Sequence, residues 1–124
     1  MDRNSILILD DEYDIVATVK SALGREKYSV FGFTDPLMAL EHFNTNYVNY
    51  GLVISDLRMP AMNGFDFIKG VKQIRSEVKV LLMSAFSVVD DSDFTMRFKA
   101  YNIDGFIQKP FSIRQLNKIV KKHM

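Results

Sequence analysis

Short apolar runs alternate with helical patterns from one end of the chain to the other. Each run has four to six residues, and they lie at residues 6–9, 29–33, 51–55, 78–83 and 105–108. The first run is continuously apolar and stops at the pair Asp10-Asp11. Runs of this kind are typical of strands that are buried on both faces of a parallel sheet. The sequence therefore predicts five strands separated by helices.

Helical patterns fill the segments between the runs and follow the last one. Thr34 and Asp35 offer capping side chains before Pro36, and Ser112 and Gln115 have the spacing of a capping box. The buried face of the last helix is expected to contain Ile113, Leu116, Ile119 and Val120. Five strand–helix units predict an α/β fold, a flavodoxin-like doubly wound sheet. We expect five parallel strands in the order 2-1-3-4-5, with five helices on both faces.

The composition limits the classes of function. A chain of 124 residues is expected to form a single domain, residues 1–124. Because it has no cysteine, disulfides and thiolate metal sites are excluded. A net charge of +1 gives no overall attraction to nucleic acid or membranes, and no apolar run approaches the ~18 residues of a membrane span. We expect a cytoplasmic protein that binds neither nucleic acid nor membranes, with His42 and His123 on its surface.

Polar residues with complementary chemistry follow four of the predicted strands. Asp10 and Asp11 follow the first, Asp56 the third, Ser84 the fourth and Lys109 the fifth. The carboxyl ends of the strands in an open α/β sheet form the binding crevice, which lies where the winding direction reverses. In the order 2-1-3-4-5 this reversal lies between strands 1 and 3. The fold is therefore expected to bring these side chains into one pocket.

Three carboxylates this close together repel one another, so either some of them stay protonated or a cation lies among them. All of the available ligands are oxygens, which favours Mg²⁺, while Ca²⁺ would require more of them. A magnesium ion beside a lysine and a hydroxyl is suited to holding a phosphoryl group.

Four segments resemble the receiver domains of two-component response regulators, including the single-domain chemotaxis regulator. They are residues 9–11, residues 56–64 with the run Met-Pro-Ala-Met-Asn-Gly, the pair Ser84-Ala85, and residues 104–111 around Lys109-Pro110-Phe111. The resemblance extends from Ile6 to about Lys122. It implies a phosphorylation-dependent signalling switch.

The resemblance implies a role for each residue of the pocket. Asp56 is the expected phosphoacceptor, which takes a phosphoryl group from the phosphohistidine of a histidine kinase or phosphotransfer protein. Lys109 is expected to pair with the phosphoryl oxygens, and Ser84 to donate its hydroxyl to them. Phe106 corresponds to the aromatic residue of the switch, and Pro110 is expected to follow a cis peptide bond.

The resemblance also implies the metal ligands. Asp11 and Asp56 are expected to bind Mg²⁺ directly, together with the backbone carbonyl of Arg58. Asp10 is expected to bind the ion directly or through water. Mn²⁺ or Ca²⁺ could substitute.

The output is expected to be a change of shape on the face formed by the fourth helix, the fifth strand and the fifth helix. A downstream protein or output domain would bind this face. The resemblance implies a phosphoacceptor with self-catalysed phosphorylation and dephosphorylation rather than an enzyme. The protein is expected to be a monomer or a phosphorylation-dependent dimer.

Three alternative functions fit the sequence less well. A metal-dependent aspartyl-phosphate phosphatase of the haloacid-dehalogenase type has a second aspartate two residues after its nucleophile, whereas Arg58 occupies that position here. A degenerate receiver that acts only as an interaction module would lack some of the pocket residues, and all of them are present. A flavin-binding module of the same topology is disfavoured because the acids at residues 10–12 would repel the flavin phosphate.

Some positions depart from the family pattern. Ser84 and Lys109 are 25 positions apart, more than the family leads one to expect, and the excess is assigned to residues 86–93. The acids there, Asp90, Asp91 and Asp93, suit either a solvated helix start or an altered output surface. Ile103 replaces a residue that is usually small. Arg58 and Phe86 lie two residues past the acceptor and the hydroxyl, and we hypothesise that their bulk slows hydrolysis of the acyl phosphate.

Overall fold

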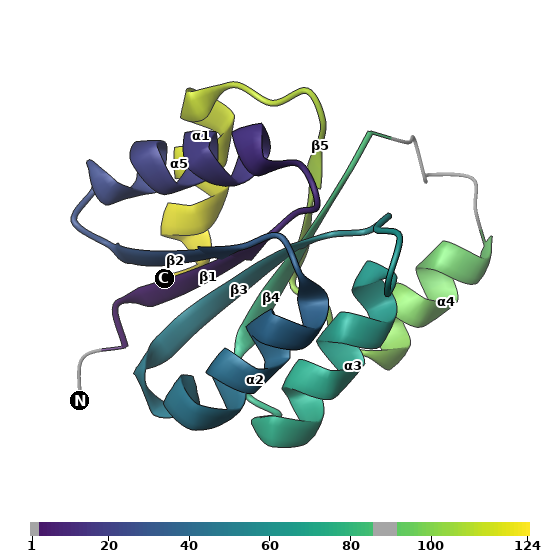
Figure 1. Cartoon of the computed structure of the whole chain (residues 1–124). Coiled ribbons are helices and arrows are strands. Elements are labelled where there is room, and N and C mark those ends of the chain that lie inside the picture. The colour runs from purple at the N-terminus through teal and green to yellow at the C-terminus, as the bar shows by residue number, and fades with distance from the viewer. Residues whose placement is uncertain (1–2, 86–91) are drawn as a thin grey trace.

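The computed structural model describes residues 3–85 and 92–124, along which strands and helices alternate. The elements are β1 Ser5–Leu9, α1 Tyr13–Gly24, β2 Ser29–Phe33, α2 Pro36–Asn46, a 3₁₀ helix η1 Tyr47–Asn49, β3 Tyr50–Asp56, α3 Gly64–Ile74, β4 Lys79–Ser84, α4 Ser92–Ala100, β5 Gly105–Gln108 and α5 Ile113–His123. The strands form one parallel sheet in the order β2-β1-β3-β4-β5 (Figure 1). The predicted fold class and strand order are confirmed.

The sheet separates two apolar clusters. Successive side chains of a strand point to opposite faces, so Ile6 and Ile8 of β1 belong to one cluster and Leu7 and Leu9 to the other. Helices α1 and α5 cover the first cluster, and α2, α3 and α4 cover the second (Figure 1). These four apolar side chains of β1 are fully buried, which explains why this run is continuously apolar.

The helices begin where the capping signals place them. Asp35 is the N-cap of α2, where its side chain accepts a hydrogen bond of 2.9 Å from the Leu37 amide, and Pro36 follows in the first turn. Ser112 and Gln115 form the predicted capping box at α5, with reciprocal hydrogen bonds of 3.1 and 2.8 Å. These bonds satisfy amide groups that the first turn of a helix leaves unpaired.

The buried face of α5 differs from the prediction at one residue. Ile113 was expected to be buried, but its exposed fraction is 45%. It is the first residue of the helix, and the buried positions begin one turn later, at Leu116 and Val120. The apolar spacing indicated the correct face but not the turn at which the helix meets the sheet.

His42 lies only partly on the surface, where it was expected. Its ring is half-buried on α2, with centroids 5.4 and 5.0 Å from those of Phe31 and Phe33 on the edge strand β2. Its Nε2 lies 2.6 Å from the hydroxyl of the buried Tyr50. Burial lowers the pKa of His42. The aromatic neighbours on β2 and β3 come from other parts of the sequence, so the helix pattern alone does not indicate this environment.

Helix α4 packs on the protein mainly through aromatic rings. Phe94 is its buried residue, with ring centroids 5.5 Å from Phe65 of α3 and 5.7 Å from Phe106 of β5. Asp93, in the first turn, forms an ion pair of 3.5 Å with Arg97, as expected of an acid at a helix start. The predictions for Phe86, Asp90 and Asp91 lie outside the described residues.

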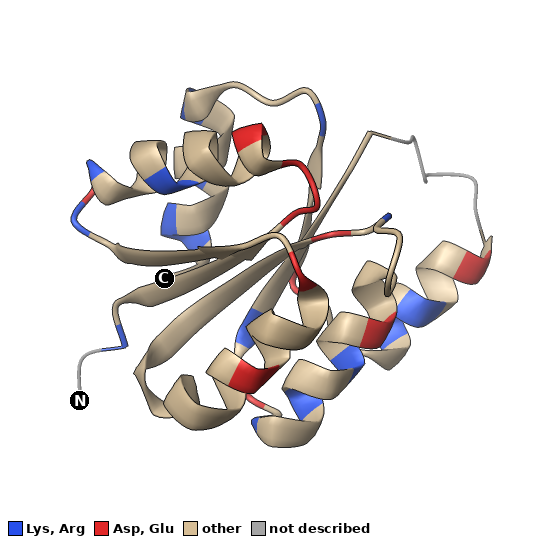
Figure 2. Ribbon diagram, viewed as in Figure 1, with Lys and Arg blue, Asp and Glu red and all other residues tan. Residues whose placement is uncertain are grey.

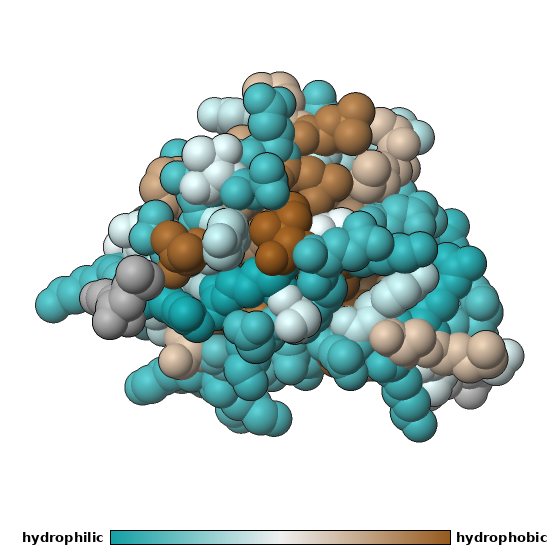
Figure 3. All heavy atoms as spheres, turned by 90° about the horizontal axis from the view of Figure 1, so that it is seen from below, coloured by the Kyte–Doolittle hydropathy of each residue, from teal (hydrophilic) through white to brown (hydrophobic). Residues whose placement is uncertain are grey.

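Hydrophilic residues cover most of the side that carries α2, α3 and α4, and hydrophobic residues reach the surface in small patches (Figure 3). Such scattered apolar exposure is ordinary for a protein surface. Within residues 3–85 and 92–124, no helix is both long and apolar enough to cross a membrane.

Candidate functional site

The predicted polar residues meet at the carboxyl edge of the sheet. Asp56 and Ser84 are the last residues of β3 and β4, while Asp10 and Lys109 directly follow β1 and β5. The strand register aligns these ends, since Leu9 pairs with Ser55. Acidic residues lie on the loop after β1 and at the end of β3, and a basic residue lies on the loop after β5 (Figure 2).

Three carboxylates form the centre of the site. Ligand oxygens of Asp10, Asp11 and Asp56 all lie within 4.8 Å of one another. Asp10 is fully buried and Asp56 is 6% exposed, whereas Asp11 is exposed. The site thus has two buried acids at its base and one acid open to solvent.

Lys109 bridges the two buried acids. Its Nζ donates a hydrogen bond of 2.6 Å to Oδ2 of Asp10 and lies 3.1 Å from Oδ1 of Asp56. The lysine side chain itself is only 15% exposed. This ammonium compensates part of the negative charge that the fold concentrates here.

The charges of the site shift two pKa values. Burial raises the pKa of Asp56 from 3.8 to about 6, and the charge of Asp10 adds to the rise, while the hydrogen bond and charge of Lys109 limit it. Burial by itself lowers the pKa of Lys109, but its hydrogen bonds and ion pairs with Asp10 and Asp56 outweigh that effect, and its pKa is raised. Near neutral pH, Asp56 therefore carries a charge that its surroundings compensate incompletely.

Backbone hydrogen bonds position the loops around the acids. The Lys109 amide donates to the carbonyl of Ser84 at 2.8 Å, which extends the pairing of β4 and β5 into the site. The amide of Glu12 donates to Oδ1 of Asp10 at 2.9 Å and so fixes the orientation of that carboxylate. The peptide bond between Lys109 and Pro110 is cis, as the resemblance implied.

Gly64 is a positioning residue that the sequence reasoning missed. A Cβ atom at this position would lie 2.4 Å from the carbonyl oxygen of Asp56, a distance that no side chain can occupy. The Gly64 amide also donates to the carbonyl of Leu57 at 2.7 Å, closing the loop that contains Arg58. In the sequence, the Asn63-Gly64 pair contributed to the family resemblance but did not indicate this role, because a close approach to Asp56 is not visible there.

The remaining predicted residues surround this centre. Ser84 is buried at the end of β4, and Arg58 is exposed on the loop after β3. Phe106 is half-buried on β5, where its ring packs edge-on against Phe94 of α4. Ser84 thus ends the strand next to β3, and Phe106 joins β5 to α4 through its contact with Phe94.

The donor set fits a divalent cation. Three carboxylates and one ammonium leave two negative charges, and the clustered ligand atoms are all oxygens. Such a site matches Mg²⁺, which binds a few carboxylates and retains several waters. The acidic cluster could therefore hold a metal.

A family model for the response regulator receiver domain matches residues 6–121. The chain belongs to this family. Receiver domains are signalling switches of two-component systems, and related response regulators imply sensor kinases and output partners in general.

Curated relatives cover the chain almost completely. It is 28% identical over 124 residues to sporulation initiation phosphotransferase F of Bacillus subtilis, and the match covers 100% of the chain and 96% of that protein. It is 34% identical over 116 residues to the regulatory protein VanRB of Enterococcus faecalis. That match covers 94% of the chain but 50% of VanRB, so the chain spans about half the length of this relative.

Solved structures agree on the fold. The chain resembles the structure of the Vibrio cholerae chemotaxis protein CheY4 with a TM-score of 0.86 and 25% identity. The match covers 97% of this chain and 98% of that one.

Proposed function

We propose that this receiver domain accepts a phosphoryl group on Asp56 from the phosphohistidine of a histidine kinase or phosphotransfer protein. The observation that supports this most strongly is the triangle of Asp10, Asp56 and Lys109, in which one ammonium lies 2.6 and 3.1 Å from two buried acids. Asp10 and Asp56 flank the crevice between β1 and β3, where the winding reverses, and Asp56 is the last residue of β3.

The transfer makes one bond and breaks one. A carboxylate oxygen of Asp56 forms a bond to phosphorus as the phosphorus–nitrogen bond of the donor breaks, and the imidazole leaves with the electron pair. Lys109 then pairs with a phosphoryl oxygen, and Ser84 donates its hydroxyl to another. The reaction needs ionised Asp56, which its pKa of about 6 allows at neutral pH.

We propose that Asp11, Asp56 and the backbone carbonyl of Arg58 hold Mg²⁺, with Asp10 binding directly or through water. When bound, the ion neutralises charge on the phosphoryl oxygens. The two uncompensated negative charges of the pocket and the proximity of its carboxylates support this assignment. Mn²⁺ or Ca²⁺ could substitute, since both bind oxygen ligands.

The proposed output follows from the position of Phe106. Phosphorylation draws Ser84 and Lys109 toward the new oxygens, and Phe106 turns inward as the Ser84 region closes. Because the Phe106 ring packs on Phe94, this movement reaches α4. The face formed by α4, β5 and α5 would then present two shapes to a downstream protein or output domain.

We propose further that residues 1–124 act as one domain in the cytoplasm, where kinases have access to ATP. The domain would act as a phosphoacceptor with self-catalysed phosphorylation and dephosphorylation, as a monomer or a phosphorylation-dependent dimer. The lone aspartate at the end of β3, with Arg58 two residues later, supports a switch rather than a phosphatase of the dehalogenase type.

The test is incubation with Mg²⁺ and acetyl phosphate, followed by intact mass measurement. The wild type should gain one phosphoryl group, while a sample with chelator and the variant Asp56→Asn should gain none. Asp66→Asn, which changes an exposed acid on α3, is the matched control and should be phosphorylated like the wild type. Phosphorylation that persists in Asp56→Asn would contradict the assignment.

A further inference from the structure

A second concave site lies at the edge of the sheet opposite Asp56. It is a pocket of about 390 Å³ lined by residues that precede or begin strands and by the end of α3. Its lining includes Arg3, Tyr47, Val48, Lys72, Arg75 and Glu77. A volume of this size falls in the range of about 300–1,000 Å³ that small-molecule sites occupy.

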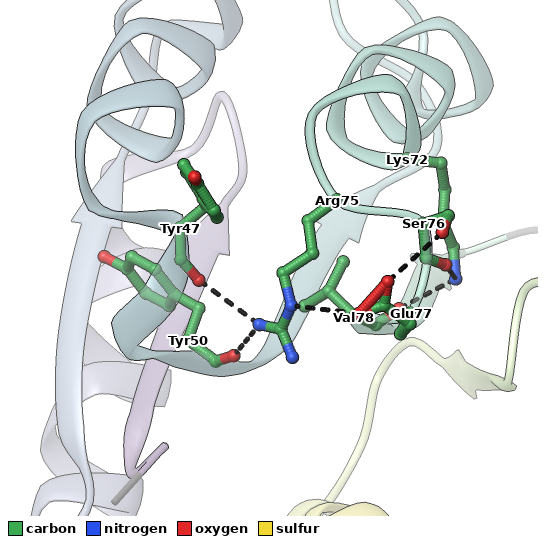
Figure 4. Close-up of polar contacts among 7 residues, drawn as sticks. All are labelled: Tyr47, Tyr50, Lys72, Arg75, Ser76, Glu77 and Val78. Carbon is green, nitrogen blue, oxygen red and sulfur yellow. Dashed lines mark hydrogen bonds and ion pairs between the residues drawn. The ribbon is translucent and has the colours of Figure 1, made fainter. Parts of the chain in front are cut away.

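Arg75 forms the inner wall of this pocket. Its side chain is 9% exposed, and its Nη1 donates to the carbonyls of Tyr47 and Tyr50 at 3.2 and 2.6 Å (Figure 4). These bonds tie the end of α3 to the segment that precedes β3. The guanidinium is therefore held in one orientation before any ligand arrives, which lowers the entropic cost of binding.

The guanidinium keeps donors that the protein does not use. Its Nε is buried without a hydrogen-bond partner, with the nearest oxygen of Glu77 at 3.8 Å. Within residues 3–85 and 92–124, no hydrogen bond joins Nη2 to a protein acceptor, and Figure 4 shows this nitrogen pointing away from the bonded carbonyls. Nε is closed to solvent, so Nη2 is the donor that an oxyanion in the pocket could reach.

The charges around the pocket favour an anion. Lys72, whose Nζ donates to the carbonyls of Ser76 and Val78 at 3.2 and 2.7 Å, and the exposed Arg3 add to Arg75. With the one carboxylate of Glu77, the lining carries three positive charges and one negative charge, a net charge of +2. Burial lowers the pKa of Arg75 and of Lys72, so both cations lack solvation that an anion would replace.

We propose that this pocket binds a phosphate monoester with a small organic group. A phosphate monoester carries a charge close to −2 at neutral pH, which matches the net charge of the lining. Tyr47 and Val48, exposed to 38% and 40%, offer an apolar rim beside the guanidinium for the organic group. The site is separate from Asp56, so its occupancy can be tested without phosphorylation.

The experiment titrates the protein with phenyl phosphate in the presence of a chelator, which keeps divalent metal out of the acidic pocket. Backbone amide NMR shifts locate the binding, and inorganic phosphate serves as the probe without an organic group. We expect saturable shifts at residues 47–50 and 73–77, with tighter binding of phenyl phosphate than of inorganic phosphate.

Three variants distinguish binding of phenyl phosphate in this pocket from nonspecific attraction of anions to the protein. Arg3→Gln should weaken the binding of phenyl phosphate by up to about fivefold and Glu77→Gln should tighten it by up to about fivefold, the upper end of the effect expected for one exposed charge. Arg114→Gln, which removes an exposed cation from the first turn of α5, is the control and should change nothing. Binding that does not saturate, shifts centred on the loops after β1 and β3, or equal effects of all three variants would overturn the proposal.

Discussion

Replacing Asp56 with asparagine should stabilise the metal-free protein, although it abolishes the proposed phosphorylation. The side chain is 6% exposed and lies beside Asp10, so its negative charge is unfavourable in the folded state. An asparagine keeps an oxygen that accepts a hydrogen bond from Lys109 and removes the charge. The variant therefore retains the shape of the site without its main electrostatic cost.

The magnitude follows from the pKa. Burial raises the pKa of Asp56 from 3.8 to about 6. Each pKa unit corresponds to about 1.4 kcal/mol, so carrying this charge costs the folded state about 2 to 3 kcal/mol at pH 7. Between pH 4 and 6 the folded state binds more protons than the unfolded state. The free energy of unfolding of the wild type must therefore fall as the pH rises through this window. The variant has no carboxyl group at position 56, so its free energy of unfolding lacks this pH-dependent contribution.

The assay is urea unfolding with chelator present, measured from pH 4 to 7 for both proteins. The difference in the free energy of unfolding should grow from near zero at pH 4 to about 2 to 3 kcal/mol in favour of Asp56→Asn at pH 7. Titrating groups that do not interact with Asp56, such as His42, are present in both proteins and cancel from the difference. Glu41→Gln, which neutralises an exposed acid on α2, should match the wild type. A difference that is zero at pH 7, or that does not vary with pH, would refute the reasoning.

Four further predictions concern the metal, His42, Gly64 and the phosphoryl lifetime. Mg²⁺ should raise the unfolding midpoint of the wild type but not of Asp11→Asn, and the gain should fade as the pH drops below about 6, where Asp56 takes up a proton. Because burial lowers the pKa of His42, its imidazole should titrate below the ordinary value in NMR, and the stability that neutral His42 contributes should be lost as the pH falls below about 6.5. Gly64→Ala should cost about 1 to 3 kcal/mol in urea unfolding and slow phosphorylation by acetyl phosphate, since the added methyl would lie 2.4 Å from the carbonyl oxygen of Asp56. Arg58→Ala and Phe86→Ala should each shorten the lifetime of the acyl phosphate measured by intact mass, and unchanged lifetimes in both would reject their proposed shielding role.

The sequence predicted the ends of β1, β3 and β4 well because burial on both faces leaves a mostly apolar run, whereas the edge strands β2 and β5 are only partly buried. In a parallel sheet with the order 2-1-3-4-5, the carboxyl ends of all five strands lie at the same edge. Asp10, Asp56, Ser84 and Lys109 therefore met in the structure as expected. The capping signals at α2 and α5 were equally informative, because their hydrogen bonds form between residues that are close in sequence.

What the sequence could not indicate depends on contacts between distant segments. Lys109 was expected to face the phosphoryl group, but its shorter contact with Asp10 depends on how two loops 99 positions apart meet. The close approach of Gly64 to Asp56 and the aromatic surroundings of His42 arise in the same way. Ile113 is exposed although it has the spacing of the buried residues. The spacing of apolar residues therefore predicts which face of a helix is buried, but not the turn at which the helix begins to pack on the sheet.

The most direct test of the central claim is to locate the phosphoryl group on the chain. After treatment with acetyl phosphate and Mg²⁺, borohydride reduces an aspartyl phosphate to homoserine, which peptide mass spectrometry then assigns to a position. The account predicts homoserine at position 56 alone, and none in a sample that was not phosphorylated. Homoserine at position 10 or 11, or a phosphorylated protein that yields no homoserine, would contradict it.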